Sequence, residues 1–130
     1  AIGPHMEARV VHRPKLAGLT RIGLSFVNSA KGFTGAFKAE EAFRQEVGLA
    51  LILIPLGIYL GKTGIERALL VSTVLLVLIV ELLNTGIETV VDRIGLERHE
   101  LSGLAKDVGS MAVLFSLTNF LVVWGFVLFA

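Results

Sequence analysis

The sequence contains no cysteine, only 3 prolines and few charged side chains. The absence of cysteine excludes disulfides and thiolate metal sites. Charged residues make up 18% of the 130 residues, whereas 54% are hydrophobic and the mean hydropathy is +0.77. Soluble domains of this length are much less apolar. The composition therefore indicates a membrane protein, and the apolar runs described below predict that it is all-α.

The N-terminal region carries no sign of a secretory signal. The first residues, AIGPHM, lack the charged and apolar segments of a signal peptide and are interpreted as a cloning remnant, residues 1–6. Residues 7–19 are expected to be flexible, and residues 20–130 to form a single domain. The net charge of +1 gives no indication of a nucleic-acid partner, and none is expected.

Long apolar runs follow the first third of the chain. The run from Val47 to Leu60 has no charge over 14 residues, and Val108 to Ala130 has none over 23. About 20 apolar residues are needed to cross a bilayer as a helix. With flanking uncharged residues and the apolar stretch that precedes Glu81, the sequence predicts three transmembrane helices, over residues 43–61, 66–92 and 107–129.

Lysine and arginine are distributed unevenly around these spans. Of the 12 such residues, only Lys62 and Arg67 lie at the turn that joins the first two spans. The others lie before or at the start of the first span, or between the second and the third. Because positive residues collect on the cytoplasmic side, the N-terminus is expected in the cytoplasm and the C-terminus outside, in the periplasm.

Residues 20–38 show a helical pattern of a different kind. Five apolar residues fall within an arc of about 80° at 100° per residue; they are Ile22, Phe26, Ala30, Phe33 and Phe37. Arg21, Lys31 and Lys38 lie outside this arc. The pattern predicts an amphipathic helix on the cytoplasmic membrane surface, and a helix packed against the spans is the alternative.

The stretch LGKTG, residues 60–64, resembles part of a phosphate-binding P-loop. That motif needs two glycines separated by four residues and followed by Lys and Ser or Thr. Gly61, Lys62 and Thr63 fit the end of the pattern, but Gly57 is one residue too close. The stretch also lies between two apolar runs on the expected outer side. It is therefore interpreted as a polar turn.

The second span carries an acidic stripe at its cytoplasmic end. Glu81, Asn84, Glu88 and Asp92 share an arc of about 80° on a helix. Ionisable residues at membrane depth are costly and are functional candidates. The topology brings other carboxylates and Lys106 to the same level, and oxygen ligands without His or Cys suit Mg²⁺. The set is suited to phosphoryl transfer.

Three stretches resemble a known family. AEEAFRQE (39–46), VELLNTGIETVVDRIG (80–95) and HELSGLAKDVGS (99–110) closely resemble the prokaryotic integral-membrane diacylglycerol kinases. The likeness extends from about Arg21 to the C-terminus. It implies a homotrimer in the bacterial inner membrane, each subunit a single kinase domain. The trimer would transfer the γ-phosphate of MgATP to diacylglycerol, giving phosphatidic acid at the cytoplasmic interface.

The resemblance also implies roles for individual residues. Glu81 would be the general base, and Glu40 and Glu88 would hold Mg²⁺. The lipid would meet Glu46, Glu81 and Ser110. The ATP site would be lined by Arg21, Asn28, Glu40, Asn84, Glu88, Glu97, His99, Lys106 and Asp107. Asn28 and Arg98 stand where the enterobacterial enzyme has Tyr, which leaves their contact with the adenine open.

Two alternatives remain at this stage. The undecaprenol kinases are a branch of the same family, but the loop HELSG is similar to the diacylglycerol branch, whereas the other branch tends to have an HPLAK-like sequence. The alternative outside the family is a non-enzymatic, ion-coupled transporter or assembly subunit with Glu81 as a buried proton carrier. Such a protein would not consume ATP.

Overall fold

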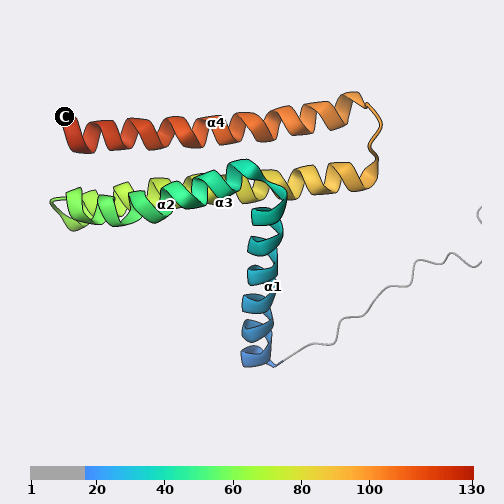
Figure 1. The fold of residues 1–130 in the computed structure, drawn as a ribbon, viewed down its shortest axis with the longest axis horizontal. Coiled ribbons are helices and arrows are strands. Elements are labelled where there is room, and N and C mark those ends of the chain that lie inside the picture. The colour runs from blue at the N-terminus through green and yellow to red at the C-terminus, as the bar shows by residue number, and fades with distance from the viewer. Residues whose placement is uncertain (1–16) are drawn as a thin grey trace, which may run out of the picture. The chain divides into compact units, whose positions relative to one another are not determined.

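The computed structural model describes residues 17–130, which are entirely helical apart from short connections (Figure 1). It contains α1 (Gly18–Ala39), α2 (Glu41–Leu60), α3 (Gly64–Ile94) and α4 (Glu100–Phe129). The all-α prediction is therefore confirmed for these residues. The cloning remnant and most of the segment expected to be flexible lie outside them.

The chain divides into two compact units, of which the first ends at Lys31 and the second runs from Gly32 to Ala130. In the first unit, α1 exposes large apolar side chains, among them Ile22 and Phe26. The hydroxyl of Ser25 donates to the carbonyl of Arg21 one turn earlier, at 3.0 Å.

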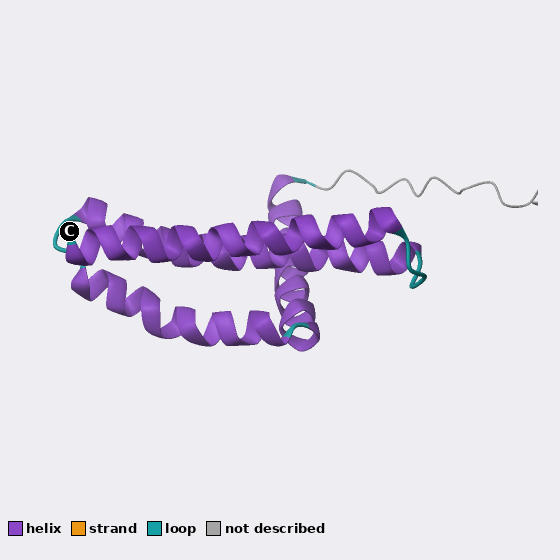
Figure 2. Ribbon diagram, turned by 90° about the horizontal axis from the view of Figure 1, so that it is seen from above, coloured by secondary structure: helices purple, strands orange, loops and turns teal. Residues whose placement is uncertain are grey.

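Three helices, α2, α3 and α4, are long and apolar enough to cross a membrane. This confirms the number of spans expected from the sequence. The helix α3 packs against both α2 and α4, and the three run along one another in Figures 1 and 2. Because most of their large apolar side chains remain exposed, the subunit presents an apolar surface suited to lipid or to other protein.

A small core joins the three spans in the half of the bundle that contains the C-terminal end of α4. Leu70 and Val74 of α3 are buried with Ala50 of α2 and Trp124 of α4. The indole N–H of Trp124 donates to the Leu70 carbonyl at 3.1 Å and to the Thr73 hydroxyl at 3.0 Å. Unpaired polar groups are costly in an apolar interior, so these bonds let Trp124 pack deeply.

The stretch LGKTG forms the tight turn between α2 and α3. Thr63 is the N-cap of α3, and its hydroxyl accepts from the N–H of Glu66 at 3.1 Å. The Glu66 carboxylate in turn accepts from the N–H of Lys62 at 2.6 Å. Gly61 is required by packing, since a Cβ there would lie 2.6 Å from Cγ of Arg67. The turn is held by its own side chains and does not have the form of a phosphate-binding loop.

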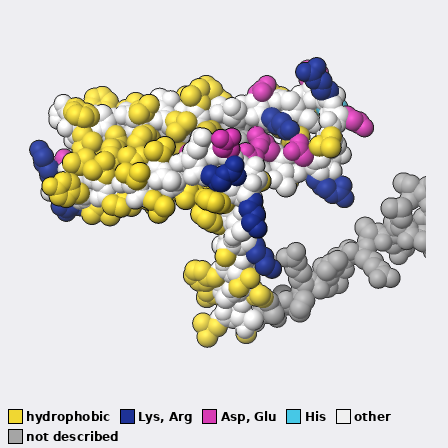
Figure 3. Space-filling model, in the orientation of Figure 1, with side chains coloured by type: hydrophobic (Ala, Val, Ile, Leu, Met, Phe, Trp, Pro, Cys, Tyr) yellow, Lys and Arg dark blue, Asp and Glu magenta, His cyan; other side chains and the backbone are white. Residues whose placement is uncertain are grey.

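Charged side chains separate from apolar ones along the three spans. Figure 3 shows hydrophobic side chains over the half near the C-terminus, and most Asp and Glu side chains toward the end where α3 connects to α4. The end where α3 connects to α4 therefore carries the candidate site.

Candidate active site

Four carboxylates meet at the charged end of the spans: Glu40 before α2, Glu46 in α2, and Glu81 and Glu88 in α3. We call these residues the acidic cluster. Glu81 is only 4% exposed. It interacts electrostatically with Glu46, Glu88 and Glu40. The helix period places Glu81 and Glu88 on one face of α3, and packing of α2 against that face adds the other two.

The junction of α1 and α2 positions Glu40. Its extended backbone (φ −117°, ψ 114°) makes it the N-cap of α2, but its side chain forms no cap hydrogen bond. Arg44 stabilises the end of α1, because its guanidinium donates to the carbonyls of Phe37 and Lys38 at 2.8 and 3.1 Å. Phe43 is 1% exposed. These contacts fix the first turn of α2 and leave the carboxylate of Glu40 free to face α3.

Glu40 and Glu88 form a carboxylate pair. Burial raises the pKa of the Glu40 carboxyl, and a hydrogen bond to Glu88 and the charges of Glu88 and Glu81 raise it further, against the opposing charge of Arg44. Two carboxylates this close need a shared proton or a cation between them.

The donor set of this pair fits Mg²⁺. Within residues 17–130 there is no group of three or more His, Cys, Asp or Glu side chains arranged to hold a metal alone. Mg²⁺ usually binds through one or two carboxylates together with substrate phosphates. Glu40 and Glu88 match that arrangement, and the remaining ligands would come from a phosphate-bearing substrate and water.

Asn84 lies between Glu81 and Glu88 at the contact of α3 with α4. Its amide nitrogen is 3.5 Å from Oε1 of Glu88, at the limit of a hydrogen bond. Its buried Oδ1 has no hydrogen-bond partner. Gly109 of α4 packs directly against this side chain, and a Cβ at Gly109 would overlap with Oδ1. The absence of a side chain at residue 109 therefore permits the position of Asn84.

We expect Gly109→Ala to lower activity by roughly tenfold to a hundredfold, because the added methyl must displace Asn84, and small misplacements of site groups are expensive. The matched control is Gly125→Ala in the same helix, where a Cβ has no neighbour within 4 Å. Initial rates for both variants, with their folding checked by circular dichroism, test this. Equal rates in the two variants would contradict it.

A hollow of about 190 Å³ lies at the connection of α3 and α4. Three residues expected at the ATP site, Glu97, His99 and Lys106, line it. His99 is the N-cap of α4, and its Nδ1 accepts from the N–H of Leu101 at 3.0 Å. His99 therefore has a structural role at the start of α4, which the sequence did not indicate.

Lys106 is paired with Asp92 across the α3–α4 connection. Its ammonium is 2.9 Å from the Asp92 carboxylate, and both side chains are close to half exposed. Asp92 lines the same hollow but was not among the predicted site residues. Its place on the acidic stripe was the available signal, yet its partner is on another helix. Exposed pairs of this kind stabilise the fold by about 0–1 kcal/mol, so the main consequence of this pair is that it holds the Lys106 side chain against α3.

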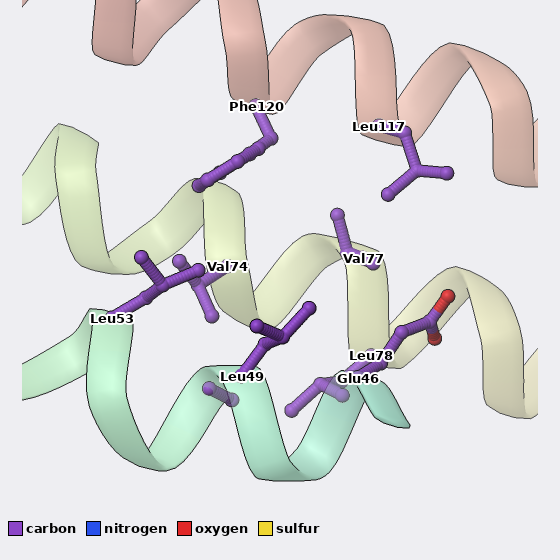
Figure 4. Close-up of a pocket in the computed structure, with 9 residues that line it drawn as sticks. Glu46, Leu49, Leu53, Val74, Val77, Leu78, Leu117 and Phe120 are labelled. Atoms are coloured by element: carbon purple, nitrogen blue, oxygen red, sulfur yellow. The ribbon is translucent and has the colours of Figure 1, made fainter. Parts of the chain in front are cut away.

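A second hollow, of about 60 Å³, opens between the three spans. Figure 4 shows Glu46 at its edge among apolar side chains such as Leu49, Val77 and Phe120. One carboxylate oxygen of Glu46 is buried without a hydrogen-bond partner. A buried acceptor beside an apolar space suits a ligand that carries both a hydroxyl and a hydrocarbon chain.

Within residues 32–130, no hydrogen bond or ion pair joins the predicted residues Asp107 and Ser110 to the acidic cluster. Asp107 and Ser110 are exposed on α4, and Arg21 and Asn28 are exposed on α1 in the first unit. Their assignment stays a prediction. Sequence reasoning also missed Thr85, whose buried hydroxyl oxygen has no hydrogen-bond partner next to Asn84.

Comparison with known proteins identifies the family. The model of the prokaryotic diacylglycerol kinase family matches residues 27–128. The chain is 56% identical to the diacylglycerol kinase of Haemophilus influenzae over 115 residues, which cover 88% of this chain and 98% of that protein. It is 50% identical to that of Pseudomonas aeruginosa over 85% of this chain and 90% of the relative. It is 49% identical to that of Escherichia coli K12 over 82% of this chain and 88% of the relative. The chain therefore belongs to the prokaryotic diacylglycerol kinase family.

Proposed function

We propose that this protein transfers the γ-phosphate of ATP to the hydroxyl of diacylglycerol, giving phosphatidic acid and ADP. The observation that carries the proposal is the pairing of Glu40 with Glu88 directly beside the buried Glu81. The pair suits a cation that binds phosphates, and Glu81 suits a base that water does not reach. The relatives' names favour diacylglycerol over undecaprenol as the acceptor.

Glu81 accepts the proton of the lipid hydroxyl as the new bond to phosphorus forms. The hydroxyl O–H bond breaks, the oxygen attacks the γ-phosphorus, and the bond from that phosphorus to the bridging oxygen of ADP breaks. The 4% exposure of Glu81 keeps water from competing with the lipid for the base. Its electrostatic interactions with Glu88 of the pair and with Glu46 support a position of Glu81 where the two substrates meet.

The phosphates face Lys106, whose positive charge attracts them. Glu40 and Glu88 would hold Mg²⁺, which would neutralise charge on the phosphates. Lys106, oriented by Asp92, offers a positive charge to the γ-phosphate. The hollow lined by Glu97 and His99 is adjacent to Lys106 and receives the nucleoside.

The lipid approaches from the apolar side. Glu46 lies beside the glyceride end, whose single hydroxyl gives its proton to Glu81, while Leu49 and Phe120 contact the start of the acyl chains. Ser110 adds a polar contact at the same boundary. The protein assembles as a homotrimer in the inner membrane, with α1 on the cytoplasmic surface. The excess of Lys and Arg before α2 and between α3 and α4 supports a cytoplasmic N-terminus and a periplasmic C-terminus.

The direct test is an assay of purified protein in mixed micelles with labelled ATP and Mg²⁺. Diacylglycerol should yield labelled phosphatidic acid, and undecaprenol little product. Preferential labelling of undecaprenol would show that undecaprenol, and not diacylglycerol, is the acceptor. The absence of any labelled lipid with folded, assembled protein would refute the proposal.

We expect Glu88→Gln to shift the Mg²⁺ requirement upward by about tenfold or more, because it removes one charged ligand of the pair. Rates measured over a Mg²⁺ series at fixed ATP give the shift. Glu100→Gln, at an exposed position in the first turn of α4, is the control and should keep the wild-type curve. An unchanged dependence of the rate on Mg²⁺ for Glu88→Gln would show that Glu88 is not a metal ligand.

A further inference from the structure

Asn119 is a polar side chain exposed on the outside of the membrane-spanning bundle. It lies on α4 ten residues before Phe129, the last residue of that helix. At 1.5 Å per residue this is roughly 15 Å from the helix end, about half of a 30 Å hydrocarbon layer. The amide is therefore expected near the middle of the bilayer.

Asn119 stands at the rim of a groove between α3 and α4. The groove has a volume of about 350 Å³ and is lined by Ser72, Thr73, Leu75, Leu76, Ile79 and Asn119. The hydroxyl of Ser72 donates to the carbonyl of Leu69 at 3.1 Å, which leaves its oxygen able to accept. Among residues 17–130 nothing is hydrogen-bonded to the side chain of Asn119.

An exposed amide at this depth requires a partner that can hydrogen-bond. Lipid tails have no donors or acceptors, and an amide in hydrocarbon without a partner costs several kcal/mol. A soluble protein does not reach the bilayer centre. A second copy of this chain does, and it brings the same polar groups to the same depth. An amide both donates and accepts, so Asn119 is complementary to itself and to the free acceptor of Ser72.

We propose that the groove between α3 and α4 is a contact between copies of this chain, closed by a hydrogen bond from Asn119 to Asn119 or Ser72 of another copy. The apolar side chains Leu75, Leu76 and Ile79 surround that bond and supply packing. The contact does not require the proposed reaction. It places the proposed assembly on a particular face of the subunit.

Association measurements test the hydrogen bond. Asn119→Leu keeps the side-chain size but removes both polar groups, and with them the hydrogen bond between helices that holds this contact. We expect the dissociation constant between subunits, measured by fluorescence transfer over a detergent dilution series, to rise by roughly tenfold. Leu121→Met, on the opposite side of α4 and also exposed, is the control. An equal constant for both variants would overturn the proposal.

The absence of cysteine allows a second, geometric test. Asn119→Cys and Ser72→Cys chains carrying tags of different size are assembled together and oxidised in membranes without substrate. We expect a disulfide between copies at 119–119 or 119–72, well above that of a Leu121→Cys control. No excess over the control would overturn the proposal. Neither readout involves ATP or lipid phosphorylation, so failure here is distinguishable from failure of the proposed function.

Discussion

Replacing Glu81 by Gln is expected to lower the turnover of lipid phosphorylation by about 10² to 10⁴-fold, the usual contribution of a general base. Gln has nearly the same shape but cannot take the proton. The fold should persist, because the substitution removes a charge from a buried site that also contains Glu46 and Glu88. Initial rates at saturating ATP and diacylglycerol, with a thermal unfolding curve on the same sample, provide the measurement.

The matched control for this prediction is Glu41→Gln. Glu41 is exposed in the first turn of α2, one residue after Glu40, and belongs to no proposed site. It should keep near wild-type turnover. If Glu81→Gln also keeps it, the base has been assigned to the wrong residue, and Glu46, the cluster carboxylate that borders the apolar hollow, is the next candidate.

The helices were predictable because a bilayer leaves a chain few options. Backbone polar groups cannot be left unpaired in hydrocarbon, so a long uncharged run must be a continuous helix. This reasoning needs only residue types along the chain. It gave the number of spans correctly, including α2, whose central run was short by itself.

The residues facing one another across two helices could not be predicted in this way. Helical periodicity placed Asn84 and Glu88 on one face of α3, but it does not show that Gly109 of α4 packs against Asn84. Likewise the sequence does not show that the charge partner of Lys106 is Asp92 on α3. Such contacts depend on the rotation of one helix against another, which composition does not fix.

Local hydrogen bonding was partly visible in the sequence. Thr63 and Glu66 have the spacing of a helix N-terminal capping pair, and that signal outweighs the incomplete P-loop. The corresponding role of His99 at α4 was not visible, because His is not among the residues that usually cap helices. Its assignment to the ATP site came from resemblance, and both roles are compatible with a ring that caps through Nδ1.

Lysines 62 and 106 provide the second large prediction. Lys106→Ala is expected to lower the rate by about 10² to 10³-fold, the usual loss when a group that stabilises developing charge is removed. Lys62→Ala should leave the KM for ATP within about threefold of wild type. Lys62 lies in the turn at the other end of α3, and the 31 residues of that helix span roughly 45 Å at 1.5 Å per residue. Its N–H bond to Glu66 is unaffected by the substitution. Steady-state rates over an ATP series compare the two.

Asp92→Asn breaks the ion pair that joins Lys106 to α3 but keeps the positive charge of Lys106. The exposed ion pair contributes about 0–1 kcal/mol to stability, so its loss alone should not unfold the protein. If Lys106 acts on the phosphate, Asp92→Asn loses less activity than Lys106→Ala, because the ammonium remains. Equal losses would mean that the pair only joins the helices.

A larger loss of activity for Lys62→Ala than for Lys106→Ala, in folded protein, would contradict both the membrane topology and the interpretation of LGKTG as a turn.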